Sequence, residues 1–192
     1  MHLVMNMRKT DYEIMSEIVN RWSPRAFEPV DMKEEDLLAM FDAARWAPSS
    51  YNNQPWRFIY ALRGTAEWDK LFSLLIEFNQ SWAKNSSAIV LIASKKTFEN
   101  GKPSLTHQFD TGSAWQNFSL EAVRRGYYTH GMQGFDYEKA YELLNIPEDY
   151  EVLSMTVVGK KASPDTLPDE LREKEVQSDR KPISEIAFKG SM

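Results

Sequence analysis

The sequence predicts an α+β or α/β sandwich, in which helices pack on a sheet. Segments with apolar residues at helical spacing alternate with short apolar runs rich in Ile and Val, and helix predominates. The chain has 192 residues, which is enough to bury a sizeable core and is the size of one domain at roughly 100 to 200 residues per domain. We therefore expect a single domain over residues 1–192.

Two helices are expected before the first strand. Residues 12–20 carry apolar side chains at helical spacing. Asp31 and Glu34 have the spacing of a capping box, so a second helix is expected to open there and to stop before Pro48. The apolar positions are Ile14, Met15, Ile18 and Val19 in the first helix, and Leu37, Leu38, Phe41 and Ala44 in the second.

The next part of the chain predicts two strands around a third helix. Residues 57–62 have the pattern of a short strand, and residues 88–93 are an unbroken apolar run of the kind found in buried strands. Between them, Thr65 is placed to cap a helix. One side of that helix is expected to carry Trp68, Leu71, Phe72, Leu75 and Ile76.

A long helix and three further elements are expected in the remainder. Residues 107–125 predict a helix of about 28 Å, at 1.5 Å per residue, which ends at Gly126. A short segment at residues 127–130 then leads to a turn with two glycines. A helix over residues 136–144, capped by its first residue, and a strand over residues 152–158 follow.

Two segments carry more apolar side chains than a single chain is expected to bury, which predicts an obligate homodimer. The long helix carries more apolar surface than one face of a thin sheet needs, next to small residues that would let another helix approach closely. After Gly159, residues 160–181 are dense in charge and proline and predict an extended, solvent-exposed arm, yet the arm ends in an apolar set. The residues concerned are Phe109, Gly112, Ser113, Ala114, Trp115, Phe118, Leu120 and Val123 in the helix, and Ile183, Ile186, Ala187 and Phe188 in the arm.

Composition excludes several classes of function. Lys and Arg total 23 against 28 Asp and Glu, a net charge of -5 without a basic tract, so we expect no nucleic-acid partner. The chain has no Cys, which excludes thiolate metal sites and a cysteine nucleophile, and we predict no metal site. No segment approaches the roughly 18 to 20 apolar residues of a membrane span or has the pattern of a signal peptide, so a cytoplasmic location without a membrane partner is expected.

Two arginines and a hydroxyl alternate just after the first helix. In extended backbone, Arg21, Ser23 and Arg25 can converge on one anion, with Trp22 between them. Guanidinium groups offer forked donors that suit phosphate, although ordinary surface ion pairs are the alternative. A further arginine, Arg180, lies near the end of the arm, where a solvated tail is the alternative.

A loop before the first strand is rich in amides and hydroxyls. Such side chains can pair with both the donor and the acceptor edges of a heterocycle, while prolines fix the backbone around them. A polar turn has a similar composition, but the order Pro-Ser-Ser-x-Asn-x-Gln-Pro-Trp is too particular for a generic turn. The candidate binding residues are Pro48, Ser49, Ser50, Asn52 and Gln54.

A glycine turn and one asparagine complete the candidates. The turn of Gly131, Met132, Gln133 and Gly134 would let backbone approach a ligand and donate an amide to an electron-rich ring atom, although a plain strand-to-helix turn explains it equally well. Asn79 is a polar residue on an otherwise apolar helix, where a satisfied buried hydrogen bond is the commoner case.

Taken in order, these segments resemble the FMN-dependent nitroreductase family, from residue 12 to the C-terminus. The series Arg21-x-Ser23-x-Arg25-x-Phe27 is similar to the family's N-terminal phosphate motif, and residues 47–56 are similar to its most recognisable segment. Residues 110–126 resemble the long helix of the family's dimer core, and residues 131–136 resemble its flavin-edge turn.

The resemblance implies a particular architecture. It is a nitroreductase-like three-layer α/β/α sandwich, with a central, mostly antiparallel sheet of four to five strands flanked by helices. Two copies would form an intertwined homodimer with two FMN sites between them. Residues 160–192 would form a C-terminal arm that wraps the partner subunit and usually adds a strand there.

The resemblance also implies cofactor contacts. Arg21, Ser23 and Arg25, around Trp22, would bind the FMN phosphate, the ribityl chain or the pyrimidine edge, and Arg180 would bind the phosphate. Arg25 would place a positive field near N1 and O2 of the ring. Residues 48–54 would come from the partner subunit and line the flavin. Asn79 matches a flavin-contacting asparagine, and Gln133 and Gly134, in the turn that begins with Gly131 and Met132, match the family's turn next to N5.

The chain departs from some longer members of the family at three positions. Gln133 stands where they have a glutamate, and Ser178 and Trp82 stand where they have lysines. Fewer cations around the flavin would stabilise its reduced anion less, so the potential and the substrate range would differ.

The function implied is that of an FMN-dependent NAD(P)H oxidoreductase, with NADH or NADPH as electron donor. Its acceptors would be nitroaromatics, quinones or related small electrophiles, reduced by ping-pong two-electron (hydride) transfer. Because the flavin carries this chemistry, no catalytic side chain is assigned. The alternatives are a flavin-binding or sensing protein of the same fold with little turnover, and a specialised dehalogenase, dehydrogenase or flavin-fragmenting enzyme.

Overall fold

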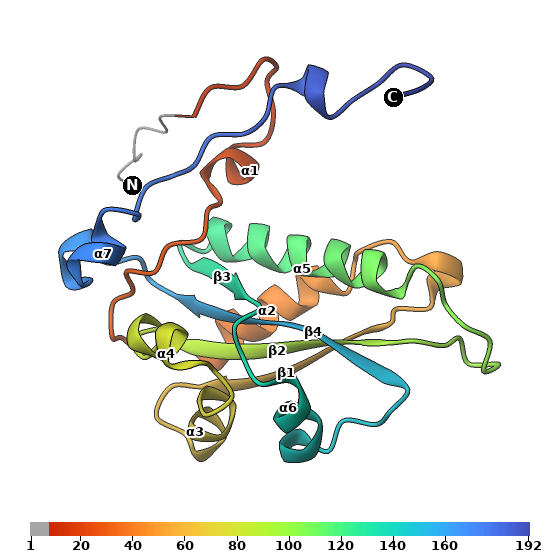
Figure 1. Cartoon of the computed structure of the whole chain (residues 1–192), viewed down its shortest axis with the longest axis horizontal. Helices are drawn as coiled ribbons and strands as arrows, with labels where there is room; N and C mark the ends of the chain where they lie inside the picture. Colours follow the sequence, from red (N-terminus) through yellow and green to blue (C-terminus); the bar gives the residue numbers. More distant parts are fainter. Residues whose placement is uncertain (1–7) are drawn as a thin grey trace.

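A four-stranded sheet forms the centre of the molecule (Figure 1). The computed structural model describes residues 8–192, so residues 1–7 of the predicted domain lie outside the described residues. The strand order is β1-β2-β4-β3, and every neighbouring pair is antiparallel. The strands are β1 (Trp56–Leu62), β2 (Ala88–Lys95), β3 (Tyr128–Met132) and β4 (Tyr150–Gly159). The predicted α+β class and antiparallel sheet are confirmed.

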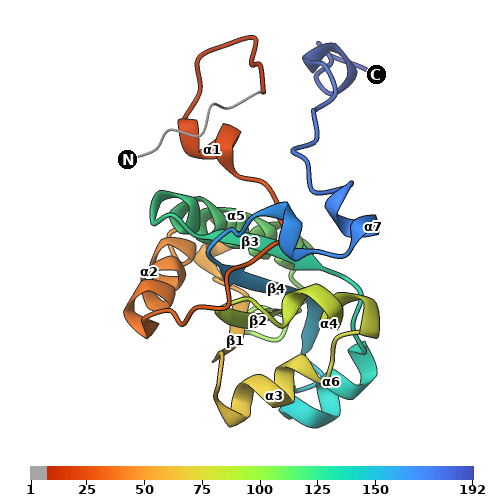
Figure 2. The same ribbon diagram turned by 90° about the vertical axis from the view of Figure 1, so that its left-hand side faces the viewer.

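Helices cover both faces of the sheet, which gives three layers (Figures 1 and 2). One face carries α2 (Glu34–Ala44) and α5 (His107–Arg124), and the other carries α3 (Ala66–Phe72), α4 (Glu77–Ala83) and α6 (Tyr137–Leu144). Within residues 8–192, none of the helices combines the length and the apolar character needed to cross a membrane.

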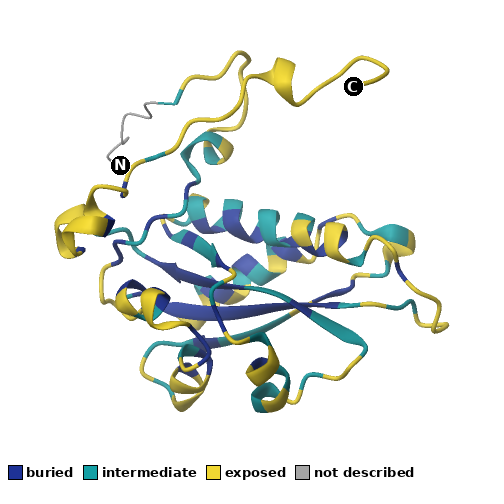
Figure 3. Cartoon of the chain, viewed as in Figure 1, coloured by how far each residue is buried: buried dark blue, intermediate teal, exposed yellow. Residues whose placement is uncertain are grey.

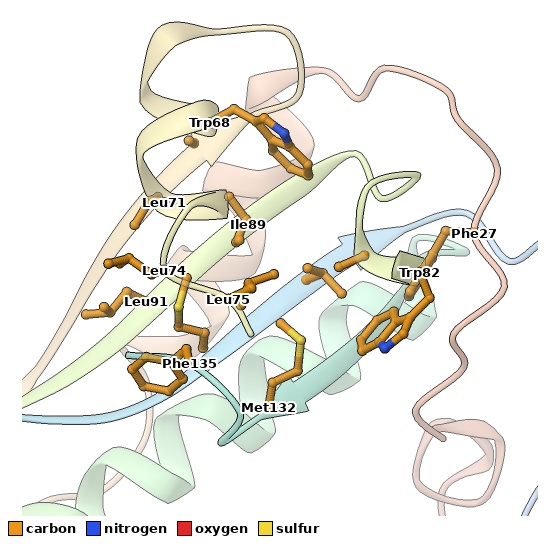
Figure 4. Close-up of a cluster of buried hydrophobic side chains, with 14 of the residues drawn as sticks. Phe27, Trp68, Leu71, Leu74, Leu75, Trp82, Ile89, Leu91, Met132 and Phe135 are labelled. Carbon is orange, nitrogen blue, oxygen red and sulfur yellow. The ribbon is translucent and has the colours of Figure 1, made fainter. Parts of the chain in front are cut away.

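The alternation of side chains along β2 divides the core in two. Val90 belongs to the apolar cluster under α2 and α5, whereas its neighbours Ile89 and Leu91 belong to the cluster under α3, α4 and α6 (Figure 4). Because both faces are covered, β2 is buried from Ala88 to Ser94 (Figure 3). This explains why its sequence is a continuous apolar run.

Local signals place several element ends correctly. The Thr65 hydroxyl accepts a hydrogen bond from the Trp68 amide at 3.2 Å, as an N-cap does. The Asp136 carboxylate accepts one from the Lys139 amide at 2.9 Å, which caps α6. Gly126 follows α5 with φ 75°, a left-handed conformation that glycine adopts without strain.

The helix predicted after Thr65 proves to be two helices. α3 ends at Phe72, and α4 starts at Glu77. The turn between them is itself buried, because Leu75 forms a bridge with Phe135 and the Ile76 amide donates to the Gly134 carbonyl. Apolar residues continue at helical spacing through this turn because the turn itself packs on the core. The spacing therefore does not reveal the break between the two helices.

The first predicted helix is much shorter than expected. α1 covers only Ser16–Asn20, and the preceding Ile14 and Met15 are 48 % and 60 % exposed. A short helix depends on tertiary packing for its stability, and these side chains find little packing in the described chain.

The capping box predicted for α2 is wrong. Lys33 occupies the N-cap position and forms no side-chain cap. Asp31 instead lies 3.7 Å from the Arg63 guanidinium group. The first turn of α2 contains three acidic residues, which favour the positive end of the helix dipole. Leu38, expected on the apolar face, is 46 % exposed.

The arm after β4 is only partly extended. It contains a 3-10 turn (Pro164–Thr166) and the short helix α7 (Asp169–Arg172), and Leu167 and Leu171 are buried in the core. From residue 178 onwards the arm is exposed and leaves the sheet on the same side as the N-terminal segment (Figure 1). Within the described chain it adds no strand to the sheet.

Candidate functional site

The segment after α1 is pinned to the end of the sheet. The Glu28 amide donates to the Lys160 carbonyl, and the Ala162 amide donates to the Ala26 carbonyl, both at 2.9 Å. Phe27, between them, is 1 % exposed and stacks on Trp82. Residues 21–25 are therefore held beside the C-terminal end of β4.

A buried glutamate of the arm supports the same segment. Glu175 Oε1 accepts hydrogen bonds from the backbone amides of Arg25 and Ala26, both at 2.8 Å. The residue is only 7 % exposed. Nothing in the sequence singles out Glu175, because a single glutamate in a charged arm carries no pattern.

Arginines from both ends of the chain gather at this place. Arg21 Nη1 donates to Ser23 Oγ at 3.3 Å. Burial lowers the pKa of Arg21, and the positive charges of Arg180 and Arg8 lower it further. Like charges that are held together in a partly buried place favour an anion between them. Arg21 therefore contacts Ser23 and lies close enough to Arg180 and Arg8 for their charges to act on it. The sequence did not single out Arg8, and the binding roles of Arg21, Ser23 and Arg180 stay predictions.

Arg25 lies over an aromatic pair. Its guanidinium carbon is 5.9 Å from the centre of the Trp82 ring, and its buried Nε has no hydrogen-bond partner in the described structure. Trp82 is 2 % exposed and packs on His130, with 4.5 Å between ring centres. Trp82, which stands where some longer members of the family have a lysine, is therefore a core residue in this chain.

His130 is uncharged at neutral pH. Burial lowers its pKa to about 4, and the charges of Arg25 and Arg21 act in the same direction. The hydrogen bond between Nδ1 and the Pro24 carbonyl, at 2.9 Å, opposes this shift but is outweighed. His130 therefore ties β3 to the arginine segment without adding a charge.

The glycine turn packs closely against α4. Asn79 Nδ2 donates to the Gly134 carbonyl at 2.9 Å, which is the satisfied buried hydrogen bond considered as the alternative for Asn79. A Cβ atom on Gly134 would lie 2.7 Å from Asn79 Nδ2 and 2.8 Å from Ile76 Cδ1. Only glycine fits this approach without displacing its neighbours.

The turn is shorter than predicted. Gly131 and Met132 belong to β3, where they pair with Thr156 and Met155 of β4. The hydrogen-bonded ladder extends to Met132, so the turn begins at the exposed Gln133.

A pocket of about 500 Å³ opens between α5 and the β3–β4 edge of the sheet. Gly131 and Gln133 line it from the sheet side, and Thr111 and Trp115 line it from α5. A Cβ atom on Gly131 would lie 3.2 Å from Trp115 Cζ2, so the indole packs directly on the glycine. The buried Trp115 Nε1 has no partner among the described residues. The volume is within the usual range for small-molecule sites.

The loop of residues 48–54 is held in an unusual conformation. The Ser50 amide donates to the buried Asp110 Oδ2 at 3.0 Å, and the Gln54 amide donates to Ser49 Oγ at 3.0 Å. Tyr51, Asn52 and Gln54 all have left-handed φ values of 51°, 55° and 48°. Each such residue stores on the order of 1 kcal/mol of strain, which is typical of functional loops.

This loop and the arginine cluster lie at opposite ends of β2. The Lys95 amide donates to the Pro55 carbonyl at one end, whereas the Ser87 amide donates to the Val158 carbonyl at the other. The eight residues of β2 span roughly 25 Å at 3.3 Å per residue. One chain therefore assembles the predicted residues in two groups that do not meet. The group at the far end consists of Pro48, Ser49, Ser50, Asn52 and Gln54.

Comparison with known proteins identifies the family. A model of the Nitroreductase family matches residues 18–81 and 65–160. Protein DrgA of Synechocystis is 29 % identical over 172 residues, covering 75 % of this chain and 82 % of DrgA. The major NAD(P)H-flavin oxidoreductase of Aliivibrio fischeri is 30 % identical over 90 residues, covering 45 % of this chain and 41 % of that protein. A crystal structure described as an oxidoreductase containing FMN has a TM-score of 0.93 and 40 % identity, covering 99 % of this chain and 98 % of that one. The chain belongs to the nitroreductase family.

Proposed function

We propose that the protein is an NAD(P)H-dependent oxidoreductase that holds FMN and reduces small electrophiles such as nitroaromatics or quinones. The observation that carries this proposal is that Arg21 donates to Ser23 Oγ, while Arg8 links the backbone of Arg21 to that of Ser178, two residues before Arg180, whose charge acts on Arg21. One relative named as an NAD(P)H-flavin oxidoreductase and a 40 % identical structure containing FMN support it.

The residues fit this cofactor. A terminal phosphate dianion would neutralise the arginine cluster and accept forked hydrogen bonds from it. Arg25 Nε and Trp115 Nε1 are buried donors without partners in the described structure, so both have a hydrogen bond to offer a ligand. The pocket of about 500 Å³ beside Gly131 and Gln133 is lined by Trp115, so that indole can donate to a ligand bound there.

The chain positions the cofactor rather than acting as an acid or base. Bound FMN supplies hydride acceptance from a nicotinamide and hydride donation to an acceptor. Arg21, Ser23 and Arg180 hold the phosphate end, and Arg25 places positive charge toward the ring. The neutral His130 keeps the arginine segment against β3 through the Pro24 carbonyl.

We further propose a homodimer in which residues 48–54 of a second copy complete the site. Two observations support it. The loop and the arginine cluster of one chain lie beyond opposite ends of β2, which is roughly 25 Å long. Large apolar side chains are also exposed: Phe109 of α5 at 77 % and Trp46, just after α2, at 75 %. The single domain over residues 1–192, its partner-wrapping arm at 160–192 and the cytoplasmic location stay predictions.

Purification under conditions that retain cofactors tests the proposal. We expect a yellow protein that releases FMN on denaturation and whose flavin absorbance is bleached by NADH or NADPH under anaerobic conditions. A protein that binds no flavin, or that releases FAD, would refute it. FMN that neither nicotinamide reduces would favour the flavin-binding or sensing alternative.

A further inference from the structure

Arg8 connects two segments that are far apart in the sequence. Its Nη1 donates to the carbonyls of Val19 at 3.0 Å and Arg21 at 2.8 Å. Its Nε donates to the carbonyl of Ser178, in the arm, at 3.1 Å. One guanidinium group therefore binds three backbone carbonyls. Two belong to Val19 and Arg21, at the C-terminal end of α1, and the third belongs to Ser178, two residues before Arg180.

The contact with the Ser178 carbonyl connects Arg8 to Arg180, a residue of the proposed anion site. Arg180 Nη1 donates to the Ser178 carbonyl at 3.2 Å and to Ser178 Oγ at 3.1 Å. The side chain of Arg180 is thus folded over the residue that Arg8 holds. On the other side, the carbonyl that Arg8 holds most closely belongs to Arg21. The side chain of Arg8 thus links the backbone segments that carry these two arginines.

This link opposes the electrostatic repulsion between Arg8 and Arg180. Burial lowers the pKa of Arg8, and the nearby Arg180 lowers it further, whereas Asp179 raises it. The positive charges of Arg8 and Arg180 repel one another. The exposed arm would therefore move away from Arg8 unless hydrogen bonds held it. Holding the arm before an anion arrives reduces the entropy lost on binding. Arg8 uses separate nitrogens of a rigid planar fork for the two segments, whereas the three donors of a lysine ammonium share one nitrogen, so lysine is expected to bridge the segments less well.

We propose that Arg8 is a positioning residue of the anion site, which clasps residues 178–180 of the arm to residues 19–21 and so keeps Arg180 beside Arg21. This inference rests on the proposed function, because the anion concerned is the FMN phosphate. It also predicts a property of the protein without any flavin, namely that the arm is held in place.

Flavin affinity tests the consequence for binding. Apoprotein variants Arg8→Ala and Arg8→Lys are titrated with FMN and with riboflavin, which lacks the phosphate, and Lys9→Ala serves as the control for a lost neighbouring charge. We expect roughly tenfold weaker FMN binding for both Arg8 variants, within the range for charge-assisted hydrogen bonds, and riboflavin binding within about twofold of the parent. Lys9→Ala should bind FMN within about twofold of the parent. An Arg8→Lys variant that binds FMN like the parent, or a Lys9→Ala variant as weak as Arg8→Ala, would overturn the clasp.

A double-mutant cycle shows whether Arg8 acts through Arg180. In an Arg180→Ala background, Arg8→Ala should weaken FMN binding by less than about twofold, because there is no second arginine left to position. An undiminished tenfold effect would contradict the inference.

The position of the arm is measured without flavin. The chain has no cysteine, so Ser184→Cys gives a single labelling site in the exposed arm. The fluorescence anisotropy of a label there should fall in the Arg8→Ala and Arg8→Lys apoproteins and stay at the parent value in Lys9→Ala. Unchanged anisotropy in the Arg8 variants would refute the clasp. If the parent binds no flavin but its arm is released by Arg8→Ala, then the proposed function fails while the clasp stands.

Discussion

Replacing His130 should flatten the dependence of stability on pH. In the folded protein its pKa is lowered to about 4 from the ordinary 6.5, chiefly by burial. The unfolded chain therefore binds more protons between these two values. The sign follows from linkage: stability is independent of this group above about pH 6.5 and is lost as the pH falls from about 6.5 to about 4.

The magnitude follows from the size of the shift. A difference of about 2.5 pKa units corresponds to about 3 kcal/mol at 1.36 kcal/mol per unit, of which about 2 kcal/mol is lost by pH 5. This is a substantial part of the 5 to 15 kcal/mol, roughly, that stabilises ordinary proteins.

Urea unfolding of the apoprotein at pH 7.5 and pH 5.0, at one protein concentration, measures this loss. His130→Asn keeps a donor near the Pro24 carbonyl but removes the titrating ring. Its loss of stability between the two pH values should be smaller than the parent's by about 2 kcal/mol. Equal losses in the parent and in His130→Asn would refute the reasoning.

Three other substitutions test separate parts of the account. Arg21→Ala should weaken FMN binding by roughly ten- to a hundredfold, with little change in the unfolding midpoint of the apoprotein, because it removes a charge-assisted phosphate contact; unchanged affinity would place Arg21 outside the site. Gly134→Ala should lower the free energy of unfolding by about 1–3 kcal/mol, since its Cβ would lie 2.7 Å from Asn79 Nδ2, and a neutral result in urea unfolding would show that the turn yields easily. Thr65→Ala should lower the same free energy by about 1 kcal/mol through loss of the α3 cap, whereas Thr65→Ser, which keeps the acceptor, should be close to the parent.

Local sequence rules predicted the parts of the fold that depend on neighbouring residues. Thr65 and Asp136 cap their helices because capping needs only a side-chain oxygen and an amide three residues on. The rule failed at Asp31, because α2 begins only at Glu34 and its N-cap position falls on Lys33. The division between α3 and α4 also escaped prediction, because the turn is fixed by Phe135 and Gly134 from elsewhere in the chain.

The candidate site shows the same limit. Arg21, Ser23 and Arg180 could be predicted because their spacing and the family resemblance point to an anion. Arg8 and Glu175 could not, because each acts on backbone atoms of a segment that is distant in sequence. The lowered pKa of His130 likewise depends on burial under the arginine segment, which no local pattern encodes.

The relative affinity of the apoprotein for FMN and riboflavin tests the central claim most directly. The two flavins share the ring and the ribityl chain, so their difference isolates the phosphate that Arg21, Ser23 and Arg180 are proposed to bind. The account predicts that FMN binds at least about a hundredfold more tightly, as two charge-assisted contacts would give, and that the preference shrinks as salt is added. Equal affinities for FMN and riboflavin would contradict it.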